Sequence, residues 1–195
     1  MKKNNTGLII GIIMVLLLVA LVVIGFFVKY TKEENSKEII KIQVGSNLYY
    51  YDLEDYNDVT YYKGFFYFIK EKQQDALFDK EITIQKIKEE NEQIEIIDEV
   101  IINNQIDSYD ARFDNNLIRS KCDTCDGDNY YNLKGKQLNN NEVEKEKEEV
   151  YVDDPGYVDR LNKMTGQSNL RFIIEKNNKG YVYYEDEKRL YVISD

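Results

Sequence analysis

The hydrophobic positions of this chain follow two patterns, one continuous and one alternating. Residues 7–28 are an unbroken apolar run from Gly7 to Val28 without a charged side chain. As a helix rising about 1.5 Å per residue, this run spans roughly 33 Å, enough to cross the hydrocarbon core of a bilayer. The pattern therefore predicts a single transmembrane helix over 7–28, preceded by a short tail over 1–6.

The flanks of this run bear on its fate and its orientation. Lys2 and Lys3 precede it, as in the charged start of an export signal. A cleavable signal has an apolar core of about 7–15 residues, so the longer run predicts an uncleaved signal anchor, with cleavage near Gly25 as the alternative. The count of lysines on the two flanks does not favour the topology that we expect on other grounds. Because the tail is short and the run emerges first, we expect the N-terminus inside and the rest of the chain outside the cytoplasm.

After a charged spacer over 29–38, apolar residues come in short alternating runs of the strand type. Gly, Asn, Asp and Ser, which favour turns, separate these runs. Ile82 and Ile84 share one spacing with Ile94 and Ile96, so we expect the four side chains on one buried face of adjacent strands. The strands are predicted over 39–44, 47–53, 59–70, 81–87, 93–102, 170–176, 181–185 and 190–194.

The middle of the chain has a weaker pattern, which allows short strands over 103–140 and either a solvated helix or a loop over 139–149. A helix start is predicted at Asp153-Asp154-Pro155, with an Asp cap and Pro in the first turn. The buried face of this helix and its C-terminal residue are predicted to be Val158, Leu161 and Met164, followed by Gly166.

Together these elements predict a mainly-β domain of antiparallel hairpins with one or two short helices over 39–195. Two similar segments within the chain suggest an alternative fold. The segment 63–68, KGFFYF, matches 179–184, KGYVYY, at a distance close to three periods of about 39 residues. Propeller blades repeat at roughly 40–45 residues, and both segments resemble blade hairpins of bacterial β-propellers. The resemblance implies a small four-blade β-propeller-like domain.

Charge limits the partners of this domain. The chain has 26 basic and 36 acidic residues. Lys2 and Lys3 are the only charged residues in 1–28. The remainder therefore has 24 basic and 36 acidic residues, which is a net charge of −12. Such a charge disfavours a general attraction to nucleic acid or to anionic lipid. We therefore expect no nucleic-acid partner, and contact with the bilayer only through residues 7–28.

The chain contains no His, which limits its chemistry further. Ser-His-Asp and Cys-His nucleophiles and His-based zinc or iron sites are excluded. The runs of tyrosine suggest an aromatic binding face, but strand alternation places about half of each run in the core. The sequence shows no Gly-rich phosphate loop, nucleophile elbow or paired-acid motif, so we name no catalytic, cofactor or metal-binding residue.

Cys122 and Cys125 form the only cysteine pair, in the motif CDTC. A second such pair, needed for an all-cysteine zinc site, is missing. Acids follow the motif and no helix start is evident to stabilise a thiolate, which disfavours redox catalysis. Outside the cytoplasm the pair predicts a local disulfide in a turn. The oxygen-rich turn at 123–129 departs from the EF-hand spacing and is predicted to be a solvated loop.

These observations predict a membrane-anchored, extracytoplasmic, non-catalytic binding or interaction module. Its ligand is expected to be another protein or a cell-surface polymer. The alternative is a structural or assembly subunit of a membrane complex that interacts through its transmembrane helix. An enzyme is the third reading, since general acid–base chemistry would fall to Asp, Glu, Tyr or Lys.

Overall fold

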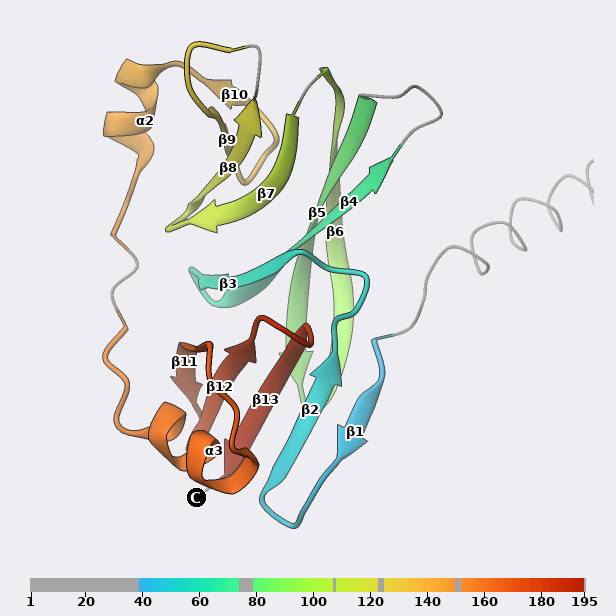
Figure 1. The fold of residues 1–195 in the computed structure, drawn as a ribbon, viewed down its shortest axis with the longest axis vertical. Coiled ribbons are helices and arrows are strands. Elements are labelled where there is room, and N and C mark those ends of the chain that lie inside the picture. Colours follow the sequence, from blue (N-terminus) through green and yellow to red (C-terminus); the bar gives the residue numbers. More distant parts are fainter. Residues whose placement is uncertain (1–38, 74–78, 107, 123–124, 150–151, 195) are drawn as a thin grey trace, which may run out of the picture. The chain divides into compact units, whose positions relative to one another are not determined.

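The computed structural model describes residues 39–73, 79–106, 108–122, 125–149 and 152–194 (Figure 1). The chain divides after Glu38, and all the described residues belong to the unit Ile39–Asp195. No helix in these described ranges is long and apolar enough to cross a membrane. The predicted tail, transmembrane helix and spacer, 1–38, lie outside them.

The described residues form three antiparallel sheets, which we name A, B and C. Sheet B consists, in spatial order, of β3 (Asp58–Tyr62), β4 (Phe65–Gln73), β5 (Asp79–Glu90) and β6 (Gln93–Ile106). Sheet C consists of β7 (Ser108–Asp114), β8 (Leu117–Cys122), β9 (Asn129–Asn132) and β10 (Gln137–Leu138). Sheet A consists of β11 (Leu170–Lys176), β12 (Lys179–Tyr184), β13 (Arg189–Ser194), β2 (Leu48–Asp52) and β1 (Lys41–Gln43). The predicted mainly-β antiparallel fold is confirmed.

Sheets B and C are simple meanders, whereas sheet A joins distant parts of the chain. In sheet A, β13 pairs with β2, and Leu190 lies opposite Tyr51. Figure 1 shows the blue β2 beside the red β13. The last strand thus lies in the interior of its sheet and is flanked by an early one.

Two apolar cores hold the sheets together, and strand β4 contributes to both. Phe66 and Phe68 pack into a core with Tyr49, Tyr51 and other residues of sheet A. The intervening residues of the same strand, Tyr67 and Ile69, pack into a core with sheet C, which contains Ala111, Ile118 and Tyr131. Because successive side chains of a strand point to opposite faces, sheet B packs against A on one face and against C on the other.

A third core lies under helix α3 (Tyr157–Thr165) on the other face of sheet A. Tyr157 and Leu161 of this helix are buried against Val182 of β12. The ring of Tyr157 lies over Gly180, where an added Cβ would be 2.2 Å from the Tyr157 Cγ atom. A glycine is required at this contact because any side chain would displace the helix.

The helices agree in part with the sequence predictions. The polar run contains α2 (Asn140–Glu146), whose N-cap Asn139 and Glu142 form a capping box. Helix α3 ends at Gly166 in the left-handed conformation, as predicted. The helix starts later than predicted, with Gly156 as its N-cap. The predicted Asp cap is present in part, because the Asp154 carboxylate accepts from the amides of Tyr157 and Val158, the first two residues of the helix. Met164 is exposed, so the predicted buried face was also partly wrong.

One predicted strand face was wrong because of a bulge. Ile82 and Ile84 are buried in the core shared with sheet C. Ile94 packs instead against the core shared with sheet A, and Ile96 is 39% exposed. The register of β5 with β6 shifts between Lys86 and Ile87, which leaves Ile97 as an extra residue. A bulge reverses the alternation of the strand beyond it, so Val100 and Ile102 take the places expected of Ile94 and Ile96.

The described residues form three sheets, not the four of the propeller alternative. The two similar segments, 63–68 and 179–184, belong to the hairpins β3–β4 of sheet B and β11–β12 of sheet A. The corresponding hairpin of sheet C is β7–β8. The interval between the two similar segments therefore runs from sheet B through sheet C to sheet A. It consists of two unequal intervals instead of three equal periods.

Candidate functional site

Three hairpin turns surround a cavity of about 480 Å³ at one end of sheets A and B. They join β3 to β4, β5 to β6 and β11 to β12, each through two residues. Both central residues of each turn have positive φ, the pattern of the type I′ turns that suit the twist of antiparallel strands. Asn91 and Asn177 adopt this conformation readily, whereas Glu92, at φ 63°, is an uncommon residue for it.

Glu89 of β5 is the buried charged group of this cavity. Its side chain is only 6% exposed. Its Oε2 atom accepts hydrogen bonds from the Tyr181 hydroxyl at 2.9 Å and from Lys176 Nζ at 3.4 Å. Lys176 Nζ also donates to the Glu89 carbonyl oxygen at 2.9 Å. A buried carboxylate requires such partners, since its desolvation is costly.

The second carboxylate oxygen of Glu89, Oε1, has no donor among the described residues. Because Glu89 lines the cavity, this oxygen is an acceptor that a bound molecule can use. The side-chain amides of Asn91 and Asn177, which also line the cavity, have no hydrogen-bond partner within the described part of the chain either. The cavity therefore offers both donors and acceptors that the fold itself leaves unused.

Ion pairs fix the charged wall of the cavity. The Glu92 carboxylate accepts from Lys179 Nζ at 2.9 Å and from Lys41 Nζ. Lys88 and Glu90 form a further pair at 2.6 Å. The lining thus contains three lysines and three glutamates, Lys88, Lys176, Lys179, Glu89, Glu90 and Glu92, so that its formal charge is zero.

The pKa values of three groups in this lining are shifted further from neutral pH. Hydrogen bonds from Lys41 and then from Lys179 lower the pKa of Glu92 to about 2. Burial would lower the pKa of Lys179, but its hydrogen bond to Glu92 leaves that pKa raised. Burial, and then the nearby charge of Glu89, raises the pKa of Tyr181 far above its ordinary value. These three side chains therefore keep their ordinary protonation states at neutral pH.

Behind Glu89 lies a group of buried tyrosines from sheet A. Tyr49, Tyr51 and Tyr181 belong to one apolar core. The Tyr51 hydroxyl is buried without a hydrogen-bond partner among the described residues. Most of the tyrosines expected in the core are buried there, but Tyr181 also presents its hydroxyl to the charged group of a cavity. No local pattern in the sequence distinguishes Tyr181 from the neighbouring tyrosines.

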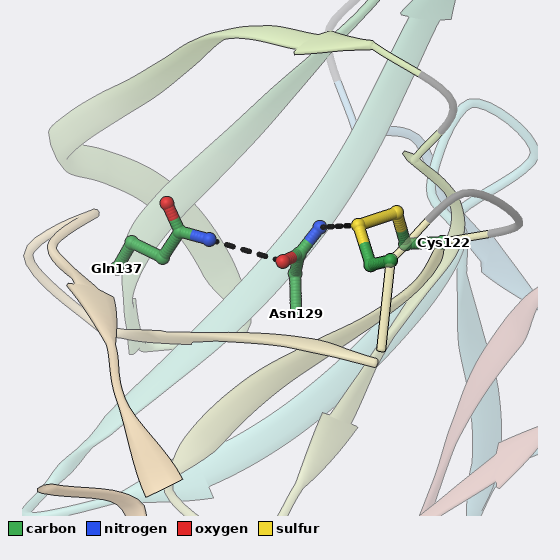
Figure 2. The surroundings of a disulfide bond; sticks show 4 residues. Cys122, Asn129 and Gln137 are labelled. Carbon is green, nitrogen blue, oxygen red and sulfur yellow. Dashed lines mark hydrogen bonds between the residues drawn. A yellow bond between two sulfur atoms is a disulfide. The ribbon is translucent and has the colours of Figure 1, made fainter. Parts of the chain in front are cut away.

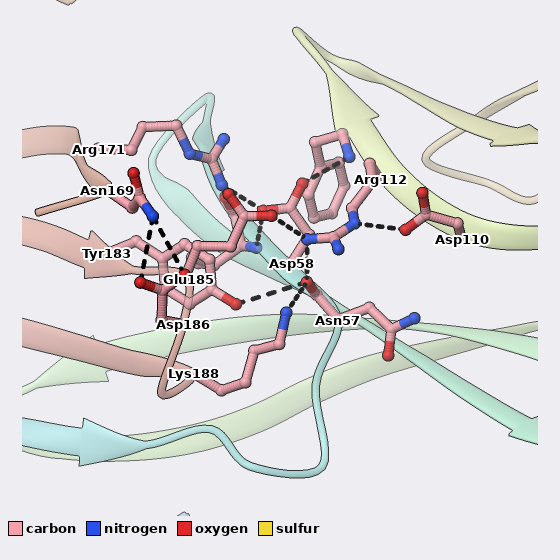
Figure 3. A network of polar contacts seen from close by, with 12 residues as sticks. Asn57, Asp58, Asp110, Arg112, Asn169, Arg171, Tyr183, Glu185, Asp186 and Lys188 are labelled. Atoms are coloured by element: carbon pink, nitrogen blue, oxygen red, sulfur yellow. Dashed lines mark hydrogen bonds and ion pairs between the residues drawn. The ribbon is translucent and has the colours of Figure 1, made fainter.

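A second polar site, which we call the Asp58 junction, links β3 of sheet B, β7 of sheet C and β11 of sheet A (Figure 3). Asp58 at the start of β3 is 4% exposed. Its Oδ1 atom accepts from the Val59 amide at 2.8 Å and from the Arg171 guanidinium of β11. Its Oδ2 atom accepts from the Phe113 amide of β7 at 2.8 Å. Both oxygens of this carboxylate are therefore engaged by the fold.

Arg112 of β7 extends the Asp58 junction. It donates to the Asn57 carbonyl oxygen at 2.9 Å, to Glu185 at 2.7 Å and to Asp110 at 2.9 Å. Hydrogen bonds from Lys121 and then from Arg112 lower the pKa of Asp110 to about 2. Because the charged side chains labelled in Figure 3 have internal partners, this site contributes cohesion between the sheets.

The predicted cysteine pair lies away from both sites, at the end of β8. The structure joins Cys122 and Cys125 by a disulfide, with a Cα–Cα distance of 5.4 Å. Asn129 donates to Cys125 Sγ at 3.7 Å and accepts from Gln137 at 3.0 Å, which ties the loop to β10 (Figure 2). Within the described residues, no group of three or more His, Cys, Asp or Glu side chains is placed to hold a metal ion.

The chain matches no protein-family profile, no curated protein and no solved structure.

Proposed function

We propose that this protein is a membrane-anchored, extracytoplasmic, non-catalytic binding module whose ligand site is the cavity around Glu89. In this proposal residues 7–28 form the transmembrane helix, and the three-sheet unit lies outside the cytoplasm. The apolar run and its six-residue tail support the anchor and the topology. The observation that carries the binding function is a cavity whose charged groups are fixed by internal ion pairs while several acceptors and donors stay unused.

Size and position also support a binding site. Ligand cavities in proteins typically measure about 300–1,000 Å³ and occur where structural layers meet. The cavity around Glu89 falls within this range and lies between sheets A and B. A second cavity, of about 310 Å³, lies between sheets B and C and is lined by Tyr67, Ile84 and Val100 among others. Its charged residues are not buried, so it lacks the fixed polar floor that Glu89 provides.

The chemistry of the Glu89 cavity favours binding over catalysis. A general acid or base works best with a pKa near the working pH. The pKa shifts of Glu92, Lys179 and Tyr181 all run the other way. No Ser, Thr or Cys lines the cavity, so aliphatic hydroxyl and thiol nucleophiles are missing from its described wall.

Site-specific photo-crosslinking of the full chain in its native membrane tests this proposal. A photoreactive phenylalanine replaces Lys88 at the cavity or, as the control, Lys163 on α3; both lysines are exposed. We expect a discrete adduct from position 88 and none from position 163. Protease added to intact cells or spheroplasts should digest the 39–195 unit before lysis. Equal labelling at the two positions, or full protection from protease, would contradict the proposal.

A further inference from the structure

We infer that the cavity around Glu89 binds a neutral, hydroxyl-rich ligand, namely a sugar ring of a cell-surface polysaccharide. This inference rests on the proposed binding function and specifies its ligand. It follows from three features of the cavity: an unused carboxylate oxygen at its floor, unused amides at its rim, and the balance of charge on its wall.

The floor requires a hydrogen-bond donor from the ligand. Glu89 Oε1 receives no bond from the described residues, while Oε2 is held by Tyr181 and Lys176. A carboxylate is an acceptor only, so the ligand atom that meets Oε1 must carry a hydrogen. Hydroxyl groups, amides and ammonium groups satisfy this condition.

The charge balance selects among these donors. Each carboxylate of the lining already has a lysine partner: Lys176 for Glu89, Lys88 for Glu90, and Lys179 for Glu92. A cationic ligand would meet the ammonium groups of these pairs, and an anionic ligand would meet the glutamates. A charged ligand would therefore have to displace an existing partner, and a neutral one would not.

The rim favours groups that donate and accept together. The free amides of Asn91 and Asn177 each present a donor and an acceptor beside the cavity. A hydroxyl is the simplest neutral group that can donate to Glu89 and also accept from an amide or an ammonium group. A saccharide ring is a neutral group that carries several such hydroxyls.

Saturation-transfer NMR on the full chain in lipid nanodiscs tests the inference. The neutral probes are the β-1,4 tetramers of glucose and of N-acetylglucosamine, and the charged probes are tetralysine and tetragalacturonate. We expect a neutral tetramer to bind and both charged probes to fail. Glu89→Gln should weaken that binding at least about tenfold, because Tyr181 and Lys176 hold its one oxygen and leave the NH2 group, which cannot accept, facing the ligand. Glu144→Gln on the exposed face of α2 is the matched control and should leave binding unchanged.

A second variant covers the possibility that Glu89→Gln fails to fold. Asn91→Gly removes one rim amide at a position where φ is 52° and glycine is favourable. We expect roughly threefold to tenfold weaker binding to the neutral tetramer. Binding that is unaffected by Asn91→Gly and Glu89→Gln would overturn the assignment, as would failure of both neutral probes. A specific adduct at position 88 combined with failure of both neutral probes would leave the binding function standing and reject only the saccharide.

Discussion

The Asp58 junction and the Glu89 cavity each place a nearly buried carboxylate of sheet B against sheet A, yet they use it differently. Both oxygens of Asp58 accept hydrogen bonds, from groups in β3, β7 and β11. Glu89 uses one oxygen for Tyr181 and Lys176 and leaves the other without a donor among the described residues. The Asp58 carboxylate thus has both oxygens hydrogen-bonded within the described residues, whereas the Glu89 carboxylate has one.

This difference suits the Asp58 junction to holding the sheets together and the Glu89 cavity to binding a ligand. A buried polar group that is fully satisfied rigidifies the fold and offers nothing to a ligand. A group that is held in place but only half satisfied is already oriented and desolvated, so a ligand that completes its bonding pays less to order it. Removing Asp58 should therefore damage stability, whereas removing contacts around Glu89 should damage stability less and binding more.

The largest effect is expected from Asp58→Ala. The substitution leaves the buried amide of Val59 and the partly buried amide of Phe113 without this acceptor and releases Arg171. We expect a loss of about 3–5 kcal/mol in the free energy of unfolding. Because the chain has tyrosines and no tryptophan, urea unfolding of the full chain in detergent is best followed by near-ultraviolet circular dichroism.

Two controls sharpen this result. Asp58→Asn keeps one acceptor oxygen and should lose less stability than Asp58→Ala. Asp126→Ala changes an exposed carboxylate in the loop after the disulfide and should stay within about 0.5 kcal/mol of the wild type. If Asp58→Ala behaved like Asp126→Ala, the Asp58 junction would not hold the sheets together.

A smaller effect is expected from a pair of Tyr→Phe variants in the tyrosine group behind Glu89. Tyr181→Phe removes the hydroxyl that donates to the buried carboxylate and should cost about 1.5–3 kcal/mol. Tyr51→Phe removes a hydroxyl that has no partner among the described residues, so stability should be unchanged or slightly increased. Equal losses in the two variants would show that Glu89 is not held through Tyr181.

The smallest effect concerns acid. The pKa of Glu92 lies at about 2, below its ordinary value of 4.5, so its stabilising ion pairs are complete above pH 4.5 and are lost as the pH falls toward 2. The pKa of Asp110 in the Asp58 junction falls from 3.8 to about 2, so its contribution is lost over a lower window. Glu92→Gln should therefore reduce the acid dependence of Tm from about pH 4.5 downward, and Asp110→Asn only from about pH 3.8 downward. Solvent screening keeps the effect of Glu92 small, and identical profiles for the two variants would contradict the separation.

The alternation of apolar and polar side chains predicted much of the fold, because the formation of hairpins depends mainly on residues that are close in sequence. The hairpins of sheet A at 170–194 and the end of α3 at Gly166 follow from turn residues and side-chain periodicity. The face of Ile94 and Ile96 could not be predicted, because the bulge at Ile97 responds to packing on both faces of sheet B. The strand predicted over 59–70 contains a turn at Lys63-Gly64, and the two apolar runs around it concealed that turn.

The candidate site could not be predicted from the sequence, because its residues are far apart along the chain. Its turns come from distant hairpins, and the ion pair of Glu89 with Lys176 joins residues 87 positions apart. One local signal was present. Thr83, Gln85, Ile87 and Glu89 alternate toward one face of β5, so an acidic residue occurs at an inward position. A charge in such a position indicates a buried partner but does not identify it.

The pairing of β2 with β13 has a consequence for the time course of folding. During synthesis the segment Leu48–Asp52 emerges early, while Arg189–Ser194 emerges after nearly all the rest of the unit. Sheets B and C need only consecutive strands and can form as they appear, because local pairing is fast. In sheet A, the edge of β2 that faces away from β1 has no partner until β13 is made. An unfinished chain is thus exposed at one edge until its final strand is inserted, and this last step commits the unit to its native state.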